Sequence, residues 1–336
     1  MEYFSAIPKT MQHEAILYSL DPMITKQQLI DQEHVFYDQE KYDALQERTQ
    51  EFQIGAIFPS QYTKRAHIKS QPYLVYYLWD ISLLDKKILG IVGPRKMSTY
   101  GQKVLETLFT HAYDYELVTI SGMAEGVDQL CHSLSMQHDI PTIAVLGGGL
   151  GRCSKRAERA MIKQIVEAGG LVLSEFRLGD QPTNYSFPQR NRIIAGLSDL
   201  LFLPEAGKKS WSLITVEFGL VMKTPVFAPP SSIFSPTSEG ILQLMESGHV
   251  KPVVDLKRFL HNHFPTQNIL SRPQLSIDLS DKEQILVSLL SHDQGVALPL
   301  LVSMSGSDID ELVQLLTMLE IKGIIAQESP GEYVLV

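Results

Sequence analysis

Residues 171–221 have the sequence LVLSEFRLGDQPTNYSFPQRNRIIAGLSDLLFLPEAGKKSWSLITVEFGLV. A short apolar run, a polar loop and a helical pattern occur in that order and are then repeated once. Pro188 fits the first turn of the first helix, where its missing N–H costs no hydrogen bond. The stretch therefore predicts two successive strand–loop–helix units, which are the building block of a parallel sheet.

Short, nearly all-apolar runs followed by amphipathic helical patterns also occur on both sides of this stretch. The predicted strands cover residues 88–93, 117–121, 141–149, 171–176, 200–206 and 225–230. Strands of this kind are typical of a parallel sheet that helices cover on both faces. Ligands of such sheets bind beyond the carboxyl ends of the strands, where the glycine- and serine-rich turns of this chain converge.

A length of 336 residues predicts two or three domains. We expect a small helical domain over residues 1–58, a parallel α/β domain over 59–272 and a winged helix over 273–336. Helices are expected at 9–20, 25–32, 39–52, 281–291, 298–304 and 308–322, and a terminal hairpin at 329–331. The predicted fold class is therefore α/β, with a helical domain before the parallel sheet and a winged helix after it.

The net charge of −9 is unevenly distributed. Residues 88–260 carry 17 basic and 16 acidic side chains, whereas residues 273–336 carry 2 basic and 10 acidic ones. A nucleic-acid site is therefore expected in the central domain, which can hold a basic groove. The helix expected at 308–322 is too acidic to contact phosphate, so we interpret the C-terminal domain as a protein-contact or folding module.

Composition excludes several classes of protein. The longest apolar run, residues 73–79, is far shorter than a membrane span, and residues 1–10 lack the basic and apolar segments of a secretory signal. Two cysteines, Cys131 and Cys153, make neither a disulfide framework nor a metal site. We therefore expect a cytoplasmic protein without membrane insertion.

The start of the helix that follows the 177–187 loop combines cations with aromatic rings. Arg190 and Arg192 come directly after Tyr185 and Phe187. A helix N-terminus favours anions, and cations beside aromatic rings bind phosphates while the rings stack exposed bases. The alternative is a surface helix with two solvated arginines and a core-facing phenylalanine.

Two glycine-containing turns at predicted strand ends are further candidates for phosphate binding. In residues 93–101, GPRKMSTYG, Gly93 allows a close turn and Arg95 precedes a helix N-terminus. Residues 121–128, SGMAEGVD, offer backbone N–H groups at the neighbouring strand, although Glu125 opposes an anion there. We expect an acidic protein that concentrates its cations where the parallel strands end.

Familiar catalytic and nucleotide-binding motifs are incomplete in this sequence. GGGLG at residues 147–151 does not continue as G-x-G-x-x-G, because position 152 is arginine. GKKS at residues 207–210 lacks the upstream glycine of a Walker A loop. No set of Ser, His and acidic residues is recognisable, and Glu217 is the one carboxylate that we consider as a candidate acid or base.

Six segments, taken in order, resemble those of the DNA-processing protein A (DprA/Smf) family. They are GIVGPRKMSTYG, SGMAEGVDQLCH, AVLGGGLG, LSEF-x₂-G-x₂-P-x₄-FPQRNRIIAGLS, EAGKKSWSLIT and PVFAPP. FPQRNRIIAGLS is the most specific of them, and the resemblance covers roughly residues 58–250. The segment LTMLEIKGII before a short wing also resembles the winged-helix module of many members.

The resemblance implies an extended Rossmann-type domain that binds single-stranded DNA and dimerises. It further implies that the protein loads a RecA-type recombinase onto incoming DNA in natural transformation, without enzymatic turnover and without a cofactor. The residues that it places in the DNA groove are Gly93, Arg95, Ser98, Ser121, Gly122, Phe187, Arg190, Asn191, Arg192, Lys208, Lys209 and Ser212. Among them we expect the cations Arg95, Arg190, Arg192, Lys208 and Lys209 to hold phosphates, and we expect bases to stack on Phe187. The expected partners are therefore single-stranded DNA, a recombinase and a second copy of the chain.

The sequence departs from the family pattern at several positions. Met123 stands where a second glycine is usual, and Trp211 replaces a glycine that lets the backbone approach. Trp211 is expected either to stack a base or to cap the sheet edge. A basic cluster of Arg152, Lys155 and Arg156 replaces a Tyr-Pro loop and adds candidate DNA contacts.

Two other hypotheses stay open at this point. The segment PEAGKKSWSLITVE at residues 204–217 faintly resembles the motif of LOG-type nucleotide phosphoribohydrolases, in which a proline- and glycine-rich turn precedes Thr and Glu. The chain would then be a nucleotide phosphoribohydrolase with Glu217 as the catalyst, or a nucleotide sensor that uses Glu217, although the double glycine of that motif is absent. The third hypothesis is an adaptor of the same fold that works through its acidic winged helix.

Overall fold

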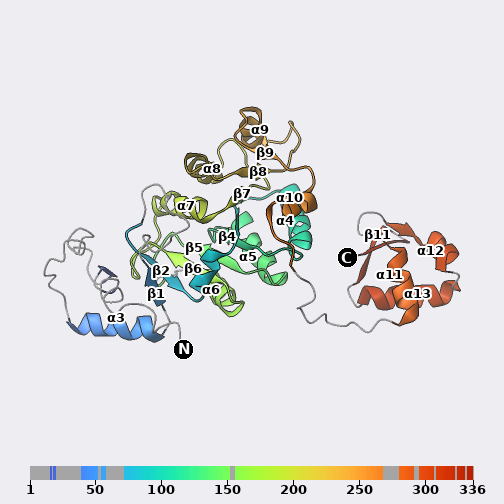
Figure 1. The fold of residues 1–336 in the computed structure, drawn as a ribbon, viewed down its shortest axis with the longest axis horizontal. Coiled ribbons are helices and arrows are strands. Elements are labelled where there is room, and N and C mark those ends of the chain that lie inside the picture. The colour runs from blue at the N-terminus through green and yellow to red at the C-terminus, as the bar shows by residue number, and fades with distance from the viewer. Residues whose placement is uncertain are drawn as a thin grey trace. The chain divides into compact units, whose positions relative to one another are not determined.

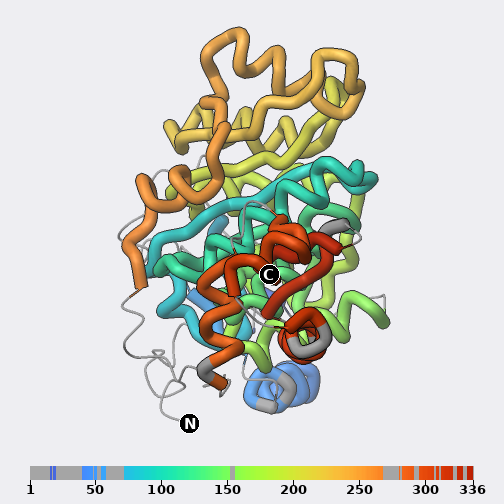
Figure 2. The backbone as a smooth tube through the Cα atoms, turned by 90° about the vertical axis from the view of Figure 1, so that its right-hand side faces the viewer, coloured from blue at the N-terminus to red at the C-terminus, as the bar shows by residue number. Residues whose placement is uncertain are grey.

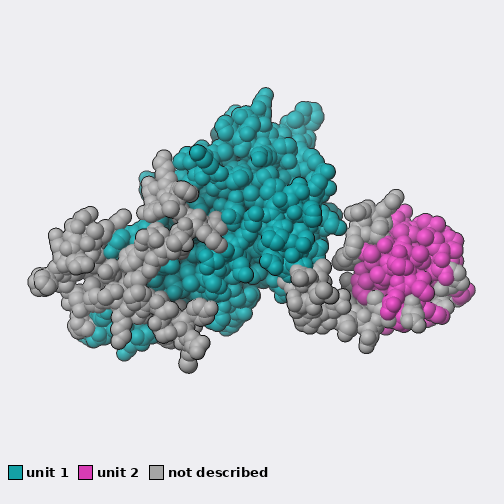
Figure 3. All heavy atoms as spheres, in the orientation of Figure 1, with its two compact units in different colours: residues 1–267 teal, residues 268–336 magenta. Residues whose placement is uncertain are grey.

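The computed structural model describes most of the chain and divides it into two compact units. The described residues are 16, 18–19, 39–51, 54–57, 72–151, 156–267, 280–290, 295–305, 308–321, 324–329 and 331–335. Unit 1 comprises residues 1–267 and unit 2 comprises residues 268–336, as Figure 3 shows in two colours. Each unit has a hydrophobic core of its own.

Strands and helices alternate along most of unit 1 (Figure 1). The strands are β1 (Ile54–Ile57), β2 (Val75–Leu78), β3 (Ile88–Ile91), β4 (Val118–Ser121), β5 (Thr142–Val145), β6 (Leu171–Ser174), β7 (Leu200–Phe202), β8 (Val226–Ala228) and β9 (Lys251–Pro252). The helices are α3 (Gln39–Glu51), α4 (Thr99–Ala112), α5 (Val127–Gln137), α6 (Arg156–Glu167), α7 (Ser186–Leu197), α8 (Ser212–Val221), α9 (Glu239–Glu246) and α10 (Leu256–His263), with the 3₁₀-helix η3 (Ile81–Asp85) between β2 and β3. From β3 onward a helix follows every strand.

The strands of unit 1 form one nine-stranded sheet in the order β1-β2-β6-β5-β4-β3-β7-β8-β9. Every pair from β6 to β9 is parallel, whereas β2 pairs antiparallel with β6 and β1 antiparallel with β2. The order reverses at β3, because β4 to β6 extend the sheet to one side and β7 to β9 to the other (Figures 1 and 2). Such a switch point is where α/β sheets bind ligands.

Helices cover both faces of the sheet. Side chains of α4, α5 and α10 pack on one face, where α6 adds a smaller apolar cluster, and side chains of α7, α8 and α9 pack on the other. Adjacent strand residues point to opposite faces, so that Ile88 belongs to one core cluster and Leu89 to the other. This double burial explains the uninterrupted apolar strands of the sequence.

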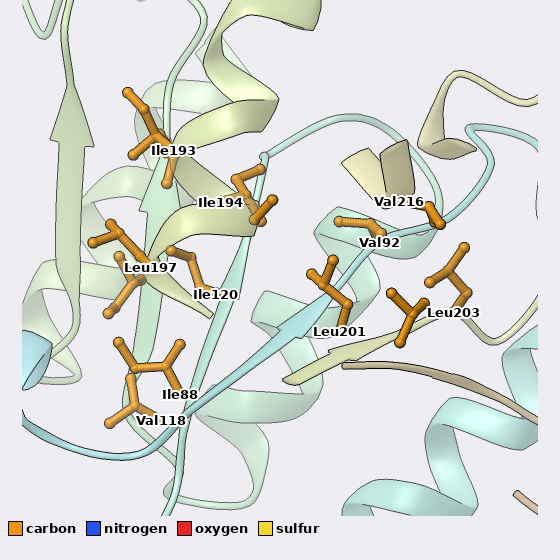
Figure 4. Close-up of a cluster of buried hydrophobic side chains, with 14 of the residues drawn as sticks. Ile88, Val92, Val118, Ile120, Ile193, Ile194, Leu197, Leu201, Leu203 and Val216 are labelled. Carbon is orange, nitrogen blue, oxygen red and sulfur yellow. The ribbon is translucent and has the colours of Figure 1, made fainter. Parts of the chain in front are cut away.

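The C-terminal half of α7 is anchored in this core. In Figure 4, Ile193, Ile194 and Leu197 of α7 lie among side chains from the strands, such as Ile88 and Ile120. All five side chains are at most 3% exposed. Burial of an aliphatic side chain contributes about 1.5–3 kcal/mol, so the axis and rotation of α7 are firmly fixed. The position of the polar residues at its N-terminus follows from that anchoring.

Unit 2 contains three helices and a small antiparallel sheet. The helices are α11 (Asp281–Leu289), α12 (Leu298–Ser305) and α13 (Ile309–Ile321), and the strands β10 (Val296–Ala297), β11 (Ile325–Ser329) and β12 (Glu332–Leu335) pair in the order β10-β12-β11. Leu286, Leu301, Leu312 and Leu316 form its core. These elements agree with the helices and the hairpin that were expected from the sequence.

The structure confirms the α/β fold class and changes some details of the expected elements. The sheet is mixed, because β1 and β2 add an antiparallel edge to the predicted parallel strands. Residues 54–57 thereby belong to the main sheet, although the sequence analysis assigned them to the helical domain 1–58. The helix expected at 39–52 is α3, whereas those at 9–20 and 25–32 and the predicted boundary at 272 lie largely or wholly outside the described residues.

Within the part of the chain that the structure describes, no helix is both long and apolar enough to cross a membrane.

Candidate nucleic-acid interface

A cavity of about 670 Å³ lies at the switch point between β3 and β7. We call it the switch-point cavity. Among the described residues, the charged side chains that line it are four cations, Arg95, Lys96, Arg190 and Lys209, and one carboxylate, Asp128. Residues expected from the sequence that line it are Gly93, Arg95, Phe187, Arg190, Asn191, Lys209, Trp211 and Ser212. The excess of cations suits an anionic ligand.

The turn after β3 presents Arg95 to the cavity. Gly93 lies against Val127 at the start of α5, and a Cβ at Gly93 would be 2.5 Å from Val127 Cγ2. Gly126 has a φ of +86°, and its Cβ would be 2.5 Å from the carbonyl oxygens of Pro94 and Arg95. The two glycines allow α5 to approach the turn closely, which fixes its backbone while the Arg95 side chain stays exposed.

The N-terminus of α4, expected as a phosphate cradle, is occupied by a carboxylate of the protein itself. Glu205 is 1% exposed and accepts hydrogen bonds from Ser98 N, at 2.7 Å, and from the Ser98 hydroxyl. Ser98 also caps the helix by accepting a bond from Gly101 N at 3.2 Å. Ser98, which the family resemblance places in the DNA groove, is thereby bonded to a carboxylate that fills the anion position of this helix.

Hydrogen bonds tie the start of α7 to the end of β5. Ser186 N donates to Thr183 Oγ1 at 3.1 Å, and the Ser186 hydroxyl donates to the carbonyl of Gly147. The Phe187 ring packs on Gly147, where a Cβ would be 2.7 Å from the ring Cδ1. The Arg95 guanidinium lies over the same ring, with its central carbon 5.5 Å from the ring centroid. Phe187 therefore holds Arg95 beside the cavity.

Arg190 lies in the inner wall of the cavity and is only 3% exposed. Its Nη1 donates to the carbonyls of Gly122 and Val145, and its Nε donates to Asn191 Oδ1 at 3.1 Å. Burial lowers the pKa of Arg190 to about 10, a shift that the Asp128 carboxylate opposes, so the group is a cation at neutral pH. Gly122, which the family resemblance places in the DNA groove, thus accepts a bond from Arg190 through its carbonyl.

Arg192 does not line the switch-point cavity. Its guanidinium forms a two-pronged ion pair with the Glu175 carboxylate, with both N···O distances at 2.6 Å, and Nη1 also donates to the Gln189 carbonyl at 2.9 Å. Both side chains of the pair are 7% exposed. The carboxylate at the end of β6 therefore neutralises Arg192, which was expected from the sequence to hold a phosphate.

The loop before α8 separates two neighbouring lysines. Lys208 pairs with Glu239 across 3.4 Å at the surface, whereas Lys209 lines the cavity. The hydroxyls of Ser210 and Ser212 are 2.7 Å apart and hydrogen-bonded across the residue between them. That residue, Trp211, is 68% exposed.

The remaining predicted residues do not line the cavity. Ser121 is buried, and its hydroxyl donates to the Ile91 carbonyl at 2.7 Å, which joins β4 to β3. Arg156 is exposed at the start of α6, and Arg152 and Lys155 lie outside the described residues. Glu217, the candidate catalyst of the enzyme hypothesis, is exposed on α8 and is not part of the cavity lining.

Asp128 and His132 are buried polar residues of α5 beside Arg190, and no role was predicted for them from the sequence. Burial raises the pKa of Asp128 to about 6, and the charge of Arg190 acts against this rise. His132 is fully buried, and its Nδ1 is 2.8 Å from Thr142 Oγ1. Desolvation, reinforced by Arg190, lowers the pKa of His132 to about 3. The signal for this pair was their i, i+4 spacing on the inner side of a helix, which alone does not distinguish a site from a packed core.

A mostly parallel α/β sheet with a cationic cavity at its switch point is an arrangement typical of proteins that bind phosphate-bearing ligands. Among the described residues, no group of three or more His, Cys, Asp and Glu side chains could hold a metal ion. The family model for DNA recombination-mediator protein A matches residues 54–263. The chain therefore belongs to this family.

Relatives and solved structures agree with the family assignment. Protein Smf of Escherichia coli is 35% identical over 78% of this chain and 71% of its own length. DNA processing protein DprA of Streptococcus pneumoniae is 37% identical over 54% of this chain and 64% of its own length, and its X-ray structure superposes with a TM-score of 0.59. Its structure covers 78% of this chain and 95% of that one, at 28% identity.

A second solved structure is that of DNA processing protein A from Helicobacter pylori. It is 26% identical, has a TM-score of 0.56 and covers 63% of this chain and 95% of that one. That protein is described as having a unique single-stranded DNA binding mode. Both structures share the α/β architecture of unit 1.

Proposed function

We propose that the chain binds single-stranded DNA at the switch-point cavity and acts without catalytic turnover. The observation that carries the proposal is the lining of one cavity by Arg95, Lys96, Arg190 and Lys209. Cations hold phosphates whatever the base sequence, and unpaired bases are free to stack on nearby side chains. The single-stranded DNA binding mode of the Helicobacter pylori relative supports the same class of ligand here.

Within this proposal the site residues have two different tasks. Arg95 and Lys209 are exposed at the cavity and contact phosphates directly. Gly93, Asn191 and Ser212 line the same space and supply close backbone or polar contacts. The residues that build the site without contacting DNA are Ser98, Ser121, Gly122 and Arg192. Base specificity is weak, since phosphate contacts read no base edges.

The proposal is tested by measuring binding of a labelled oligonucleotide, single-stranded or as a duplex, across a series of salt concentrations. We expect preference for the single strand and a negative slope of log Kobs against log[salt]. The Arg95→Ala/Lys209→Ala double variant should bind about tenfold or more weakly and show a shallower slope, because each lost phosphate contact removes about 0.7 from it. Equal binding of duplex and single strand, or an unaffected double variant, contradicts the proposal.

We extend the proposal to a cytoplasmic role in natural transformation, in which a homodimer loads a RecA-type recombinase onto incoming DNA. The family description as a recombination mediator supports this role. Unit 2, which we interpret as a winged helix, would contribute protein contacts rather than DNA contacts. Glu320 on α13 and Asp308 directly before this helix are exposed, and acidic side chains repel phosphates. If the chain has this role, it should speed the assembly of recombinase on single-stranded DNA. Light scattering should give the mass of a dimer.

The enzyme hypothesis remains a measurable alternative. It requires release of free base from a nucleoside monophosphate and loss of that release in Glu217→Ala. The position of Glu217 outside the cavity lining gives it no contact with a ligand bound there. We therefore expect no release of base with either protein.

A further inference from the structure

The switch-point cavity is lined by two aromatic side chains that differ in how much of each ring is available. Phe187 is half-buried, its ring packs on Gly147, and the Arg95 guanidinium lies over it at 5.5 Å. A base could stack on that covered face only by displacing Arg95, which the proposed function requires beside a phosphate. Phe187 is therefore a poor platform for a base.

Trp211 is much more exposed than Phe187. Trp211 lines the cavity and is 68% exposed. The backbone is fixed, since Trp211 directly precedes α8, its carbonyl accepts a bond from Ile214 N at 3.2 Å, and Ser210 and Ser212 are bonded to each other. Within the part of the chain that the structure describes, no aromatic ring or cation contacts the indole. A large apolar ring held in water beside a binding cavity marks a contact site for a ligand.

We propose that Trp211 is the residue on which the site stacks an unpaired nucleobase, whereas Phe187 positions Arg95 for a phosphate. This inference rests on the proposed binding of single-stranded DNA. Lys209 lies two residues before Trp211 and lines the same cavity, so a phosphate next to the stacked base has a cation at hand. The faces of bases in a duplex are covered by their neighbours, so such a contact favours unpaired DNA.

The first experiment uses the indole as its own reporter. The chain has two tryptophans, so a Trp79→Phe parent leaves Trp211 as the only one. Emission is followed while an unlabelled single strand is added, either with all its bases or with abasic sites at every position of a central stretch. We expect strong quenching by the first strand and little by the second. Binding of the intact strand, seen by anisotropy of a labelled copy, with unchanged Trp211 emission would overturn the inference.

The second experiment separates stacking from phosphate contact by substitution. Trp211→Ala should bind the intact strand about 5- to 100-fold more weakly, since one stacked base contributes that much, while its salt slope stays that of the wild type. Trp211→Phe should recover most of the affinity. Phe187→Leu should instead reduce the salt slope, as Arg95→Ala does, because it releases Arg95 from the cavity.

Tyr185 provides a matched control. It is an aromatic residue next to the start of α7 and is 88% exposed, but it does not line the cavity, so Tyr185→Ala should bind like the wild type. If Trp211→Ala also binds like the wild type, or if its loss is as large on the abasic strand, the inference fails while the proposed function stands. If the wild type does not bind single-stranded DNA at all, both fail.

Discussion

Two pairs of cations in and beside the site carry the same charge and have opposite uses. Arg95 and Lys209 are exposed at the switch-point cavity, whereas Arg190 and Arg192 on α7 are 3% and 6% exposed. The buried pair is bound by groups of the protein itself: backbone carbonyls for Arg190 and the Glu175 carboxylate for Arg192. Burial therefore decides whether an arginine stabilises the fold or remains available to a ligand.

Substitutions of the buried pair and of the exposed pair should therefore change different properties of the protein. Removing a buried cation leaves its partner unpaired in a medium of low polarity, so the loss appears in the free energy of unfolding. Removing an exposed cation leaves the fold almost unchanged, so the loss appears in the affinity and salt dependence of ligand binding.

The largest expected effect is that of Arg192→Ala on stability. The variant leaves Glu175, which is 7% exposed, without its ion-pair partner and should lose about 3–5 kcal/mol in the free energy of unfolding, measured by urea denaturation. Arg192→Met/Glu175→Leu is the control, because it removes both charges and should recover most of the loss. A loss below about 1 kcal/mol, as for an exposed pair, would contradict the assignment of Arg192 to the interior.

The next largest effect concerns the pH dependence of stability through His132. The folded protein holds the pKa of this histidine at about 3, below its ordinary value of 6.5, so protonation of the unfolded state draws the equilibrium toward unfolding as the pH falls. The contribution is fully present above pH 6.5 and is progressively lost between 6.5 and 3. From pH 7 to pH 4 it amounts to about 3 kcal/mol.

His132→Gln isolates this contribution, because glutamine does not titrate and can still bond to Thr142. Urea denaturation at pH 7 and pH 4 should show a smaller loss for the variant than for the wild type. Other groups, among them Asp128, titrate in both proteins and largely cancel in the difference. Equal losses in the two proteins would show that His132 is not held neutral.

Ser98→Ala distinguishes a helix cap from a phosphate ligand. It removes one bond to Glu205 and the cap on Gly101 N, which should cost about 1–2 kcal/mol in stability. Under conditions where the variant is folded, the salt slope for single-stranded DNA should equal that of the wild type. A slope reduced by about 0.7 would instead restore Ser98 as a phosphate contact.

The patterns of residues 88–230 were enough to predict the strands, their parallel pairing and the helices on both faces, because nearly all-apolar strands that alternate with amphipathic helices are typical of a covered parallel sheet. The antiparallel edge was not predictable in that way. Residues 75–78 are apolar, like the other strands, and only their pairing with β6 fixes their direction. The formation of a strand is therefore easier to predict from sequence than the direction in which an edge strand pairs.

The partners of the charged side chains were the part that sequence could not supply. Glu205 lies 107 positions from Ser98, and Glu175 lies 17 positions from Arg192 on another element. Only the packing of β6 against α7, and of the β7 turn against α4, brings these atoms together. The residue types pointed to the carboxyl ends of the strands, where the switch-point cavity lies, but which cation faces the cavity is set by long-range contacts.

The smallest expected effect is that of Lys208→Ala, which makes it the sharpest control for Lys209→Ala. The two lysines are neighbours in one loop, yet Lys208 pairs with Glu239 at the surface, with its side chain 61% exposed, and Lys209 lines the cavity. Neither substitution should change the free energy of unfolding by more than about 0.5 kcal/mol. Lys209→Ala should reduce the salt slope by about 0.7, whereas Lys208→Ala should leave it nearly unchanged. Equal effects of the two variants would mean that net charge near the loop, rather than contact in the cavity, attracts the DNA.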